Sequence, residues 1–184
     1  MSSSVSVEPV SSVGLVRRAC EMTLRPGMKS SVSLAKLYMS EHSPIRAMMF
    51  WVELTGIPTF VSVHLVRHKV GVEHFVQSNR DDRGGGGDGV VNRLTPVNHG
   101  MMINAAALLA MSRKRLCFLS HKKTVAVWTR LRRAVRFWDP DLGAVMVPEC
   151  VVRGYCPEMR QCSVGLGRVL EAYAESPHCQ RRGS

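Results

Sequence analysis

A run of basic and imidazole side chains follows an apolar stretch near the middle of the chain. Arg67, His68 and Lys69 are consecutive, and Arg80 follows in the same segment. Guanidinium groups suit phosphate because their planar fork of N–H donors matches its oxygens. The run therefore predicts one side of a nucleotide-binding pocket, in which the His68 ring lies against the heterocyclic ring of the nucleotide. The alternative is a solvated helical face, where charged side chains usually lie.

Four cysteines form a second candidate site, with the spacing C-x5-C-x5-C in the last three: Cys117, Cys150, Cys156 and Cys162. Four thiolates can hold a tetrahedral zinc ion or an iron–sulfur cluster. The spacing is looser than the paired C-x2-C knuckles of zinc modules. Free buried cysteines are therefore the alternative to a metal site.

A further basic group, Arg130, Arg133 and Arg136, falls on one face of an expected helix. Such a face could lie on nucleic acid, but no helix-turn-helix, zinc-finger or aromatic-studded sheet pattern accompanies it. A solvated outer face is therefore favoured.

Composition limits the class of protein. A chain of 184 residues that is 45% hydrophobic fits one domain with a real core. The formal net charge of +11 indicates an anionic partner, which a nucleotide, a nucleic acid or an acidic membrane face would each satisfy. No run of 18 apolar residues occurs, so we expect no membrane span. The N-terminus does not resemble a secretory signal, and the cysteines lack a secreted-domain pattern, so a cytoplasmic location is expected.

The elements that must position these residues are expected to be mainly helices. We predict a flexible leader over 1–14, a folded domain over 15–165 and a basic tail over 166–184. A short helix is expected over 30–38, ended by Ser43-Pro44, and a buried strand over 47–54. The basic run is expected on a long helix over 59–79, although alternating valines make strand a rival for its first half.

The second half of the chain continues this pattern. Residues 84–89, GGGGDG, predict a loop. A phosphate cradle is disfavoured there because no strand leads into it and no Gly-Lys-Ser/Thr ends it. Helices are expected over 96–118 and 122–138, the second ended by Asp139-Pro140. Asn104 and Arg115 are three helical turns apart and would share a face.

Several of these segments resemble, in order, those of one known family. EHSPIR, residues 41–46, precedes the apolar strand, and LVRHK, residues 65–69, resembles the start of the signature RHRxxSxNxxSxRY. Gln77-Ser78-Asn79-Arg80 matches its end if one residue is inserted. Asn104 and Arg115 match a later pair, and the ending that contains Cys150, Gly154, Cys156, Glu158 and Cys162 is similar to that of a subset of members. Over residues 15–165 the chain thus resembles the flavin-dependent thymidylate synthases.

The resemblance implies an α+β single domain with a central antiparallel or mixed sheet and long helices. It also implies residue roles. FAD would be bound by Ser43, Arg46, Arg67, His68, Lys69 and Asn104. The substrate dUMP would be bound by Ser78, Arg80 and Arg115, with Ser78 and Arg115 catalytic and Gln77 as the alternative to Ser78. In this family the sites are built from several subunits of a homotetramer.

The chain also departs from the signature. Lys69 replaces its second arginine, Val72 its first serine and His74 its asparagine, and Asp81 stands in place of the final tyrosine. Exchanging arginine for lysine loses bidentate phosphate geometry. These departures bear on the substrate more than on the fold.

The reaction that the resemblance implies transfers a one-carbon unit from methylene-tetrahydrofolate to C5 of dUMP, with reduced FAD and NADPH as the reductant. Arg80 and Arg115 would stabilise negative charge that develops on the pyrimidine. One alternative is a pyrimidine nucleotide hydroxymethylase on the same scaffold, in which water completes the transfer. Another is a non-catalytic descendant that binds nucleic acid through Arg130, Arg133 and Arg136.

Overall fold

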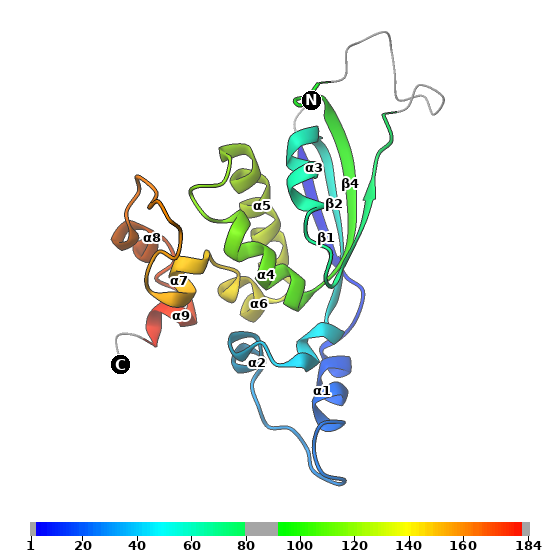
Figure 1. Cartoon of the computed structure of the whole chain (residues 1–184). Coiled ribbons are helices and arrows are strands. Elements are labelled where there is room, and N and C mark those ends of the chain that lie inside the picture. The colour runs from blue at the N-terminus through cyan, green and yellow to red at the C-terminus, as the bar shows by residue number, and fades with distance from the viewer. Residues whose placement is uncertain (1–2, 80–91, 182–184) are drawn as a thin grey trace.

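An antiparallel sheet lies along one side of the molecule (Figure 1). The computed structural model describes residues 3–79 and 92–181. Within these ranges the strands are β1 (Ser4–Pro9), β2 (Met49–Pro58), β3 (Val72–Val76) and β4 (Pro96–Asn104). Their spatial order is β1-β2-β4-β3, and each neighbouring pair is antiparallel. The expected α+β fold with a central antiparallel sheet is confirmed.

Helices cover one face of this sheet and extend past its edge. Figure 1 shows α3 (Thr59–Leu65), α4 (Ala105–Arg115) and α5 (Lys122–Trp138) on the covered face. The elements α1 (Val13–Glu21), α2 (Leu34–Ser40) and the 3-10 helix η1 (Ser43–Ala47) lie toward one end. The shorter helices α6 (Pro140–Val145), α7 (Glu149–Arg153), α8 (Leu166–Ala172) and α9 (Pro177–Gln180) follow α5. No helix in the described ranges is both long and apolar enough to cross a membrane.

Alternating side chains explain why the sheet is covered on one face. In β2 and β4 every second residue is buried, among them Phe50, Val52, Met101 and Ile103. They join an apolar core with Trp128 of α5 and other helical residues. A period of two places these side chains on the same side of a strand, so burying them determines which face the helices cover.

The expected flexible leader over residues 1–14 is wrong for residues 4–9. These residues form β1, which pairs with β2 from Ser4 opposite Thr55 to Pro9 opposite Phe50. Val7 is buried in the core, and the indole Nε1 of Trp138 donates to its carbonyl at 2.7 Å. The alternating Ser-Val pattern is a strand pattern, and the open edge of β2 provides its hydrogen-bond partners.

The long helix expected over 59–79 is also wrong. It ends at Leu65, and residues 72–76 form β3. Gly71 between them has a φ of 74°, a left-handed conformation that interrupts a right-handed helix. Val72 and Val76 are β-branched and find strand partners on β4, so long-range pairing prevails over local helix preference.

The helix expected over 96–118 is half correct. Residues 96–104 form β4, and the helix begins at Ala105. The abundant Met and Ala residues favour helix locally, but Val97, His99, Met101 and Ile103 alternate and are buried. The expected strand over 47–54 is confirmed as β2, and the helix over 122–138 as α5, whose C-cap is Asp139.

Smaller differences occur at the remaining elements. The short helix expected over 30–38 lies at Leu34–Ser40, because the side chain of Ser33 caps its start by accepting from the backbone N–H of Lys36. The segment 166–181, expected as a tail, contains α8 and α9 around a second small core of Val147, Val151, Val169 and Tyr173. The glycine run 84–89 lies outside the described residues.

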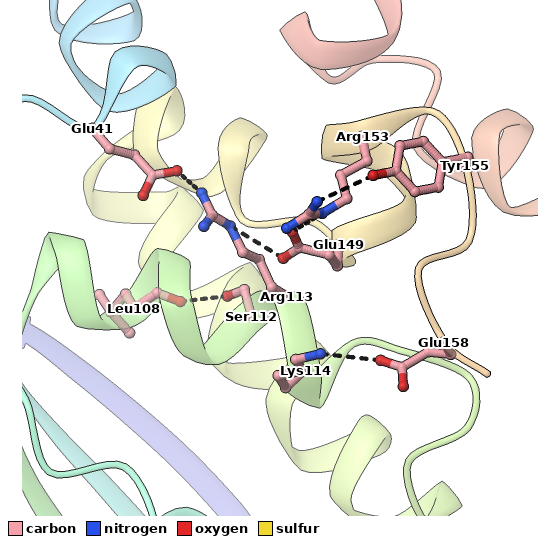
Figure 2. Close-up of polar contacts among 9 residues, drawn as sticks. All are labelled: Glu41, Leu108, Ser112, Arg113, Lys114, Glu149, Arg153, Tyr155 and Glu158. Atoms are coloured by element: carbon pink, nitrogen blue, oxygen red, sulfur yellow. Dashed lines mark hydrogen bonds and ion pairs between the residues drawn. The ribbon is translucent and has the colours of Figure 1, made fainter.

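Charged side chains hold the α7 region beside α4 (Figure 2). Arg113 pairs with Glu41 and, at 3.6 Å, with Glu149. Lys114 Nζ lies 3.1 Å from a carboxylate oxygen of Glu158. The end of α4 is therefore linked to the segment that carries the last cysteines of the predicted cysteine site.

Candidate functional site

The loop between α3 and β3, residues 66–71, carries the predicted nucleotide-binding run and lies along α4. At one end the backbone N–H of His68 donates to Leu65 at 3.0 Å, and at the other Asn104 donates its N–H to the carbonyl of Gly71 at 3.0 Å. A Cβ on Gly71 would lie 2.6 Å from the side chain of Asn104. Glycine is therefore required here both by its conformation and by close approach.

Arg115, at the C-terminal end of α4, binds this loop directly. Its Nε and Nη2 donate to Nε2 of His68 at 3.1 and 2.9 Å, and Nη2 also donates to the carbonyl of His64 at 2.6 Å. Burial, and then the charge of Arg115, lower the pKa of His68. Because its Nε2 accepts, the neutral His68 ring carries its proton on Nδ1. The site therefore presents an imidazole N–H donor beside a guanidinium group.

Further basic groups that the sequence did not single out lie around His64, whose carbonyl Arg115 binds. Arg93 lies over the ring of Phe60, 5.2 Å from its centroid, and the ring centroids of His121 and Phe60 are 4.5 Å apart. Burial lowers the pKa of His64, and the charges of Arg115, Arg67, His121 and Arg93 lower it further. These groups come from separate elements, so sequence spacing carried no signal that they would meet.

The basic cluster is not neutralised by acidic side chains within the described ranges, where Arg67, Arg93 and Arg115 form no ion pair with a carboxylate. Burial, and then the charge of Arg67, lower the pKa of Arg115. Cations that repel one another at a partly buried position are stabilised by an anionic ligand. The arrangement is suited to bind phosphate or an anionic heterocycle.

The remaining predicted FAD-binding residues lie around the start of α4. Asn104 is its N-cap, where its side-chain oxygen accepts from the N–H of Ala107 at 2.9 Å. Ser43 and Arg46 are exposed on η1, which packs against the start of α4. Ser43 also lines a cavity of about 340 Å³ between α1 and α2. The structure thus brings Arg67 and His68 to Arg115, at the C-terminal end of α4. It places Asn104, Ser43 and Arg46 around the other end of this helix. Lys69 lies between the two groups and is exposed on the loop.

The predicted substrate residues that follow β3 lie at the end of the β3–β4 pair opposite Asn104. Val72 pairs with Ile103, next to Asn104, whereas Val76 pairs with His99, so Gln77 and Ser78 follow at the opposite end. The side-chain oxygen of Gln77 accepts from the N–H of Asn98 at 3.0 Å and closes the β3–β4 pair. Arg80 lies outside the described residues.

The four predicted metal-ligating cysteines line one small cavity at the junction of α4, α7 and the loop before α8: Cys117, Cys150, Cys156 and Cys162. All four are free thiols. Burial raises the pKa values of Cys117 and Cys150, and the neighbouring cysteines raise them further. Within the described ranges, no three His, Cys, Asp or Glu side chains are grouped closely enough to share a metal ion. The thiols are gathered, but without metal-binding geometry.

The basic face of α5 is largely occupied by contacts within the chain. Arg130 Nη2 donates to the hydroxyl of Ser3 at 2.8 Å, and Arg136 pairs with Glu175. Arg133 is exposed. Two of the three side chains proposed for nucleic acid therefore stabilise β1 and the C-terminal helices.

Comparison with known proteins agrees with this fold. No family model matches the chain, and no curated protein matches it in sequence. Among solved structures, it is similar to a UMP/dUMP methylase, PolB, from Streptomyces cacaoi bound with 5-Br dUMP, with a TM-score of 0.60, 13% identity and coverage of 78% of this chain and 94% of that one. It is also similar to thymidylate synthase X from Helicobacter pylori with FAD and dUMP, with a TM-score of 0.58, 12% identity and coverage of 78% and 97%. The chain therefore has the fold that these two nucleotide-binding proteins share.

Proposed function

We propose that this protein is a flavin-dependent thymidylate synthase-like enzyme that transfers a one-carbon unit from methylene-tetrahydrofolate to C5 of dUMP, with FAD and NADPH. The observation that carries the proposal is the contact of Arg115 with His68 beside basic side chains that pair with no carboxylate of residues 3–79 and 92–181. Both residues match the motifs of the family that the sequence resembles, and the fold is that of proteins solved with dUMP or a bromo analogue of it.

The residues present fit a flavin dinucleotide. Arg67 and Lys69 are exposed cations on the 66–71 loop, and Ser43 and Arg46 are exposed on η1, so all four are accessible to a diphosphate group. His68 offers an N–H donor to a ring carbonyl. FAD, when bound, would supply the reducing equivalents, and the protein would supply orientation and charge.

The chemistry assigned to the protein is electrostatic. Attack by C5 of the pyrimidine requires electron density in the ring, and negative charge develops on its carbonyl oxygens. Arg115 is held by three hydrogen bonds, two to His68 and one to His64, and keeps further N–H donors, so it can stabilise that charge without reorganising. Ser78, or Gln77 as its alternative, and Arg80 would complete the dUMP site. We propose that another subunit contributes these residues, because Ser78 and Asn104 lie at opposite ends of the β3–β4 pair.

We propose a homotetramer, the assembly that the family resemblance implies. Figure 1 shows no helix over the other face of the sheet. Trp51 and Phe75 lie on that face, because they alternate with the more buried residues of β2 and β3, and their ring centroids are 5.5 Å apart. Gly100 beneath them leaves room for the indole, since a Cβ there would lie 3.0 Å from it. An aromatic pair on an open sheet face, with Phe75 exposed and Trp51 partly buried, is suited to an assembly surface.

The experiment that tests this function is calorimetric titration of dUMP into wild-type protein and Arg115→Ala. We expect Arg115→Ala to abolish dUMP binding while the flavin absorbance of FAD-loaded protein after desalting is retained. Arg133→Ala, which removes an exposed arginine on α5, is the matched control and should bind both ligands as wild type. Retained dUMP affinity in Arg115→Ala would contradict the assignment.

Product analysis then separates the two pyrimidine reactions. Incubation with dUMP, methylene-tetrahydrofolate and NADPH should yield a 5-methyl product and consume NADPH. A 5-hydroxymethyl product without net NADPH oxidation would instead assign the hydroxymethylase. Salt-sensitive binding of DNA or RNA, with no bound flavin, would support the non-catalytic alternative.

A further inference from the structure

Two histidines that the proposed reaction does not use, His74 and His99, link Ser62 to the backbone carbonyl of His68 through a continuous series of hydrogen bonds. We call this series the Ser62–His99–His74 relay. Ser62 Oγ lies 2.9 Å from Nδ1 of His99, and Nε2 of His99 lies 2.9 Å from Nδ1 of His74. Nε2 of His74 lies 2.8 Å from the carbonyl oxygen of His68. Both ring nitrogens of both histidines are therefore engaged. The relay runs from α3 through β4 and β3 to the 66–71 loop.

The direction of hydrogen-bond donation along the relay follows from its last member, the carbonyl oxygen of His68. A carbonyl oxygen can only accept, so Nε2 of His74 must carry a proton. In a neutral His74 ring Nδ1 then accepts, which requires the proton of His99 on Nε2. Nδ1 of His99 in turn accepts from the hydroxyl of Ser62. One carbonyl thus determines the tautomers of two histidines.

Burial favours this neutral, directed arrangement. His99 and Ser62 are 1% and 3% exposed, and His74 is half-buried. A buried polar group that loses its partner is strongly destabilised, so each member of the chain depends on the next. The relay is consequently a rigid support and not an open path for protons, because it ends at the buried Ser62.

The relay meets the candidate site at His68. The main-chain carbonyl of His68 is held by His74, while its ring is held by Arg115 through Nε2. The residue that presents an N–H donor and orients Arg115 is therefore fixed at both ends. His74 stands where the signature that the sequence resembles has asparagine, and this contact provides a reason for a histidine there.

We propose that His74 and His99 are positioning residues: the Ser62–His99–His74 relay holds the His68 carbonyl and thereby orients the His68–Arg115 pair toward its ligand. For its ligand readout the inference rests on the proposed function. The relay itself can be tested without any substrate.

The direct test is the tautomeric state of the histidines, measured by long-range ¹H–¹⁵N correlation on histidine-labelled protein at neutral pH. We expect protons on Nε2 of His74, Nε2 of His99 and Nδ1 of His68. A proton on Nδ1 of His99 in the neutral protein, or free tautomer exchange of His74, would overturn the relay even if dUMP binds normally.

Two conservative variants separate positioning from simple loss of stability. The amide nitrogen of glutamine occupies nearly the place of a histidine Nε2, whereas that of asparagine occupies the place of Nδ1. His74→Gln therefore keeps a donor to the His68 carbonyl, and His74→Asn does not. We expect dUMP to bind His74→Asn about three- to tenfold more weakly than wild type, and His74→Gln to recover most of that loss.

The controls make each outcome decisive. His178→Gln, in α9, should leave dUMP binding unchanged, and the Tm values of His74→Gln and His74→Asn should be similar. Equal dUMP affinity for His74→Gln and His74→Asn would refute the positioning role. If wild-type protein binds no dUMP, the proposed function fails, and the tautomer measurement alone decides the relay.

Discussion

At the scale of single residues, Gly71 determines where the 66–71 loop meets α4. Its φ of 74° is disfavoured for residues with a Cβ, and the Cβ of an alanine would approach the Asn104 side chain to 2.6 Å. We predict that Gly71→Ala lowers the free energy of unfolding by more than the ~1–2 kcal/mol of the backbone term alone. Chemical denaturation measures this loss.

Gly27 offers a matched control for that prediction. It also has a positive φ, 83°, but no atom lies within 4 Å of a Cβ built on it. The free energy of unfolding of Gly27→Ala should therefore fall only by the conformational contribution. Equal losses for the two variants would show that the contact with Asn104 does not constrain the loop.

A single residue, His99, makes the stability of the folded protein depend on pH. Burial, and then the charge of His74, lower its pKa from 6.5 to about 4 in the folded protein. Between these values the unfolded chain binds a proton that the folded chain does not, so stability is lost as pH falls from 6.5 toward 4. We expect Tm to fall across this window, and to fall less in His99→Gln. An unchanged slope in that variant would assign the acid sensitivity to other groups.

At the scale of elements, β1 is an integral strand of the sheet. Val7 is buried, whereas Ser4 on the same strand is exposed. We predict that Val7→Ala costs about 1–2 kcal/mol of stability, because it removes two buried methyl groups, and that Ser4→Ala costs less than about 0.5 kcal/mol. Thermal unfolding of both variants checks this. A flexible leader would instead give no difference between them.

The cysteine-lined cavity also concerns the arrangement of elements, because it lies between the end of α4 and the small C-terminal core. In the part of the chain that the structure describes, Val147, Val151, Val169 and Tyr173 form the buried part of that core. A core of this size is a reason to expect an additional constraint. Since no three of the described thiols are placed as metal ligands, a structural zinc ion or an iron–sulfur cluster would have to draw them together, and we propose that one does so.

Metal analysis of anaerobically purified protein tests that proposal. We expect about one metal equivalent per chain, lost in Cys117→Ser and retained in Cys179→Ser. Chelation should lower the Tm of wild type. Less than one equivalent per several chains, together with an unchanged Tm, would assign the cavity to free thiols.

At the scale of the whole molecule, the proposed site is completed by assembly. Light scattering should give a particle of about four times the chain mass of 20.4 kDa. Because Trp51 lies on the open sheet face, Trp51→Glu should dissociate the particle and weaken dUMP binding without unfolding the chain. A monomer that binds dUMP with wild-type affinity would contradict a shared site.

Much of this protein follows from its sequence. The apolar run after Ala47 and the long amphipathic pattern ended by Asp139-Pro140 are local signals, and the structure has β2 and α5 where they predict them. The resemblance assigned His68 to FAD and Arg115 to dUMP, whereas the hydrogen bonds between these two side chains were not predicted.

Only the tertiary structure decided the rest. Residues 4–9, 72–76 and 96–104 become strands because each finds hydrogen-bond partners far away in the sequence, and local propensity does not describe such pairing. The same long-range pairing brings His99 to His74, and the packing of α3 on the sheet brings Ser62 to His99. The sequence determined which chemical groups are present, whereas the register of the sheet determined which of them touch.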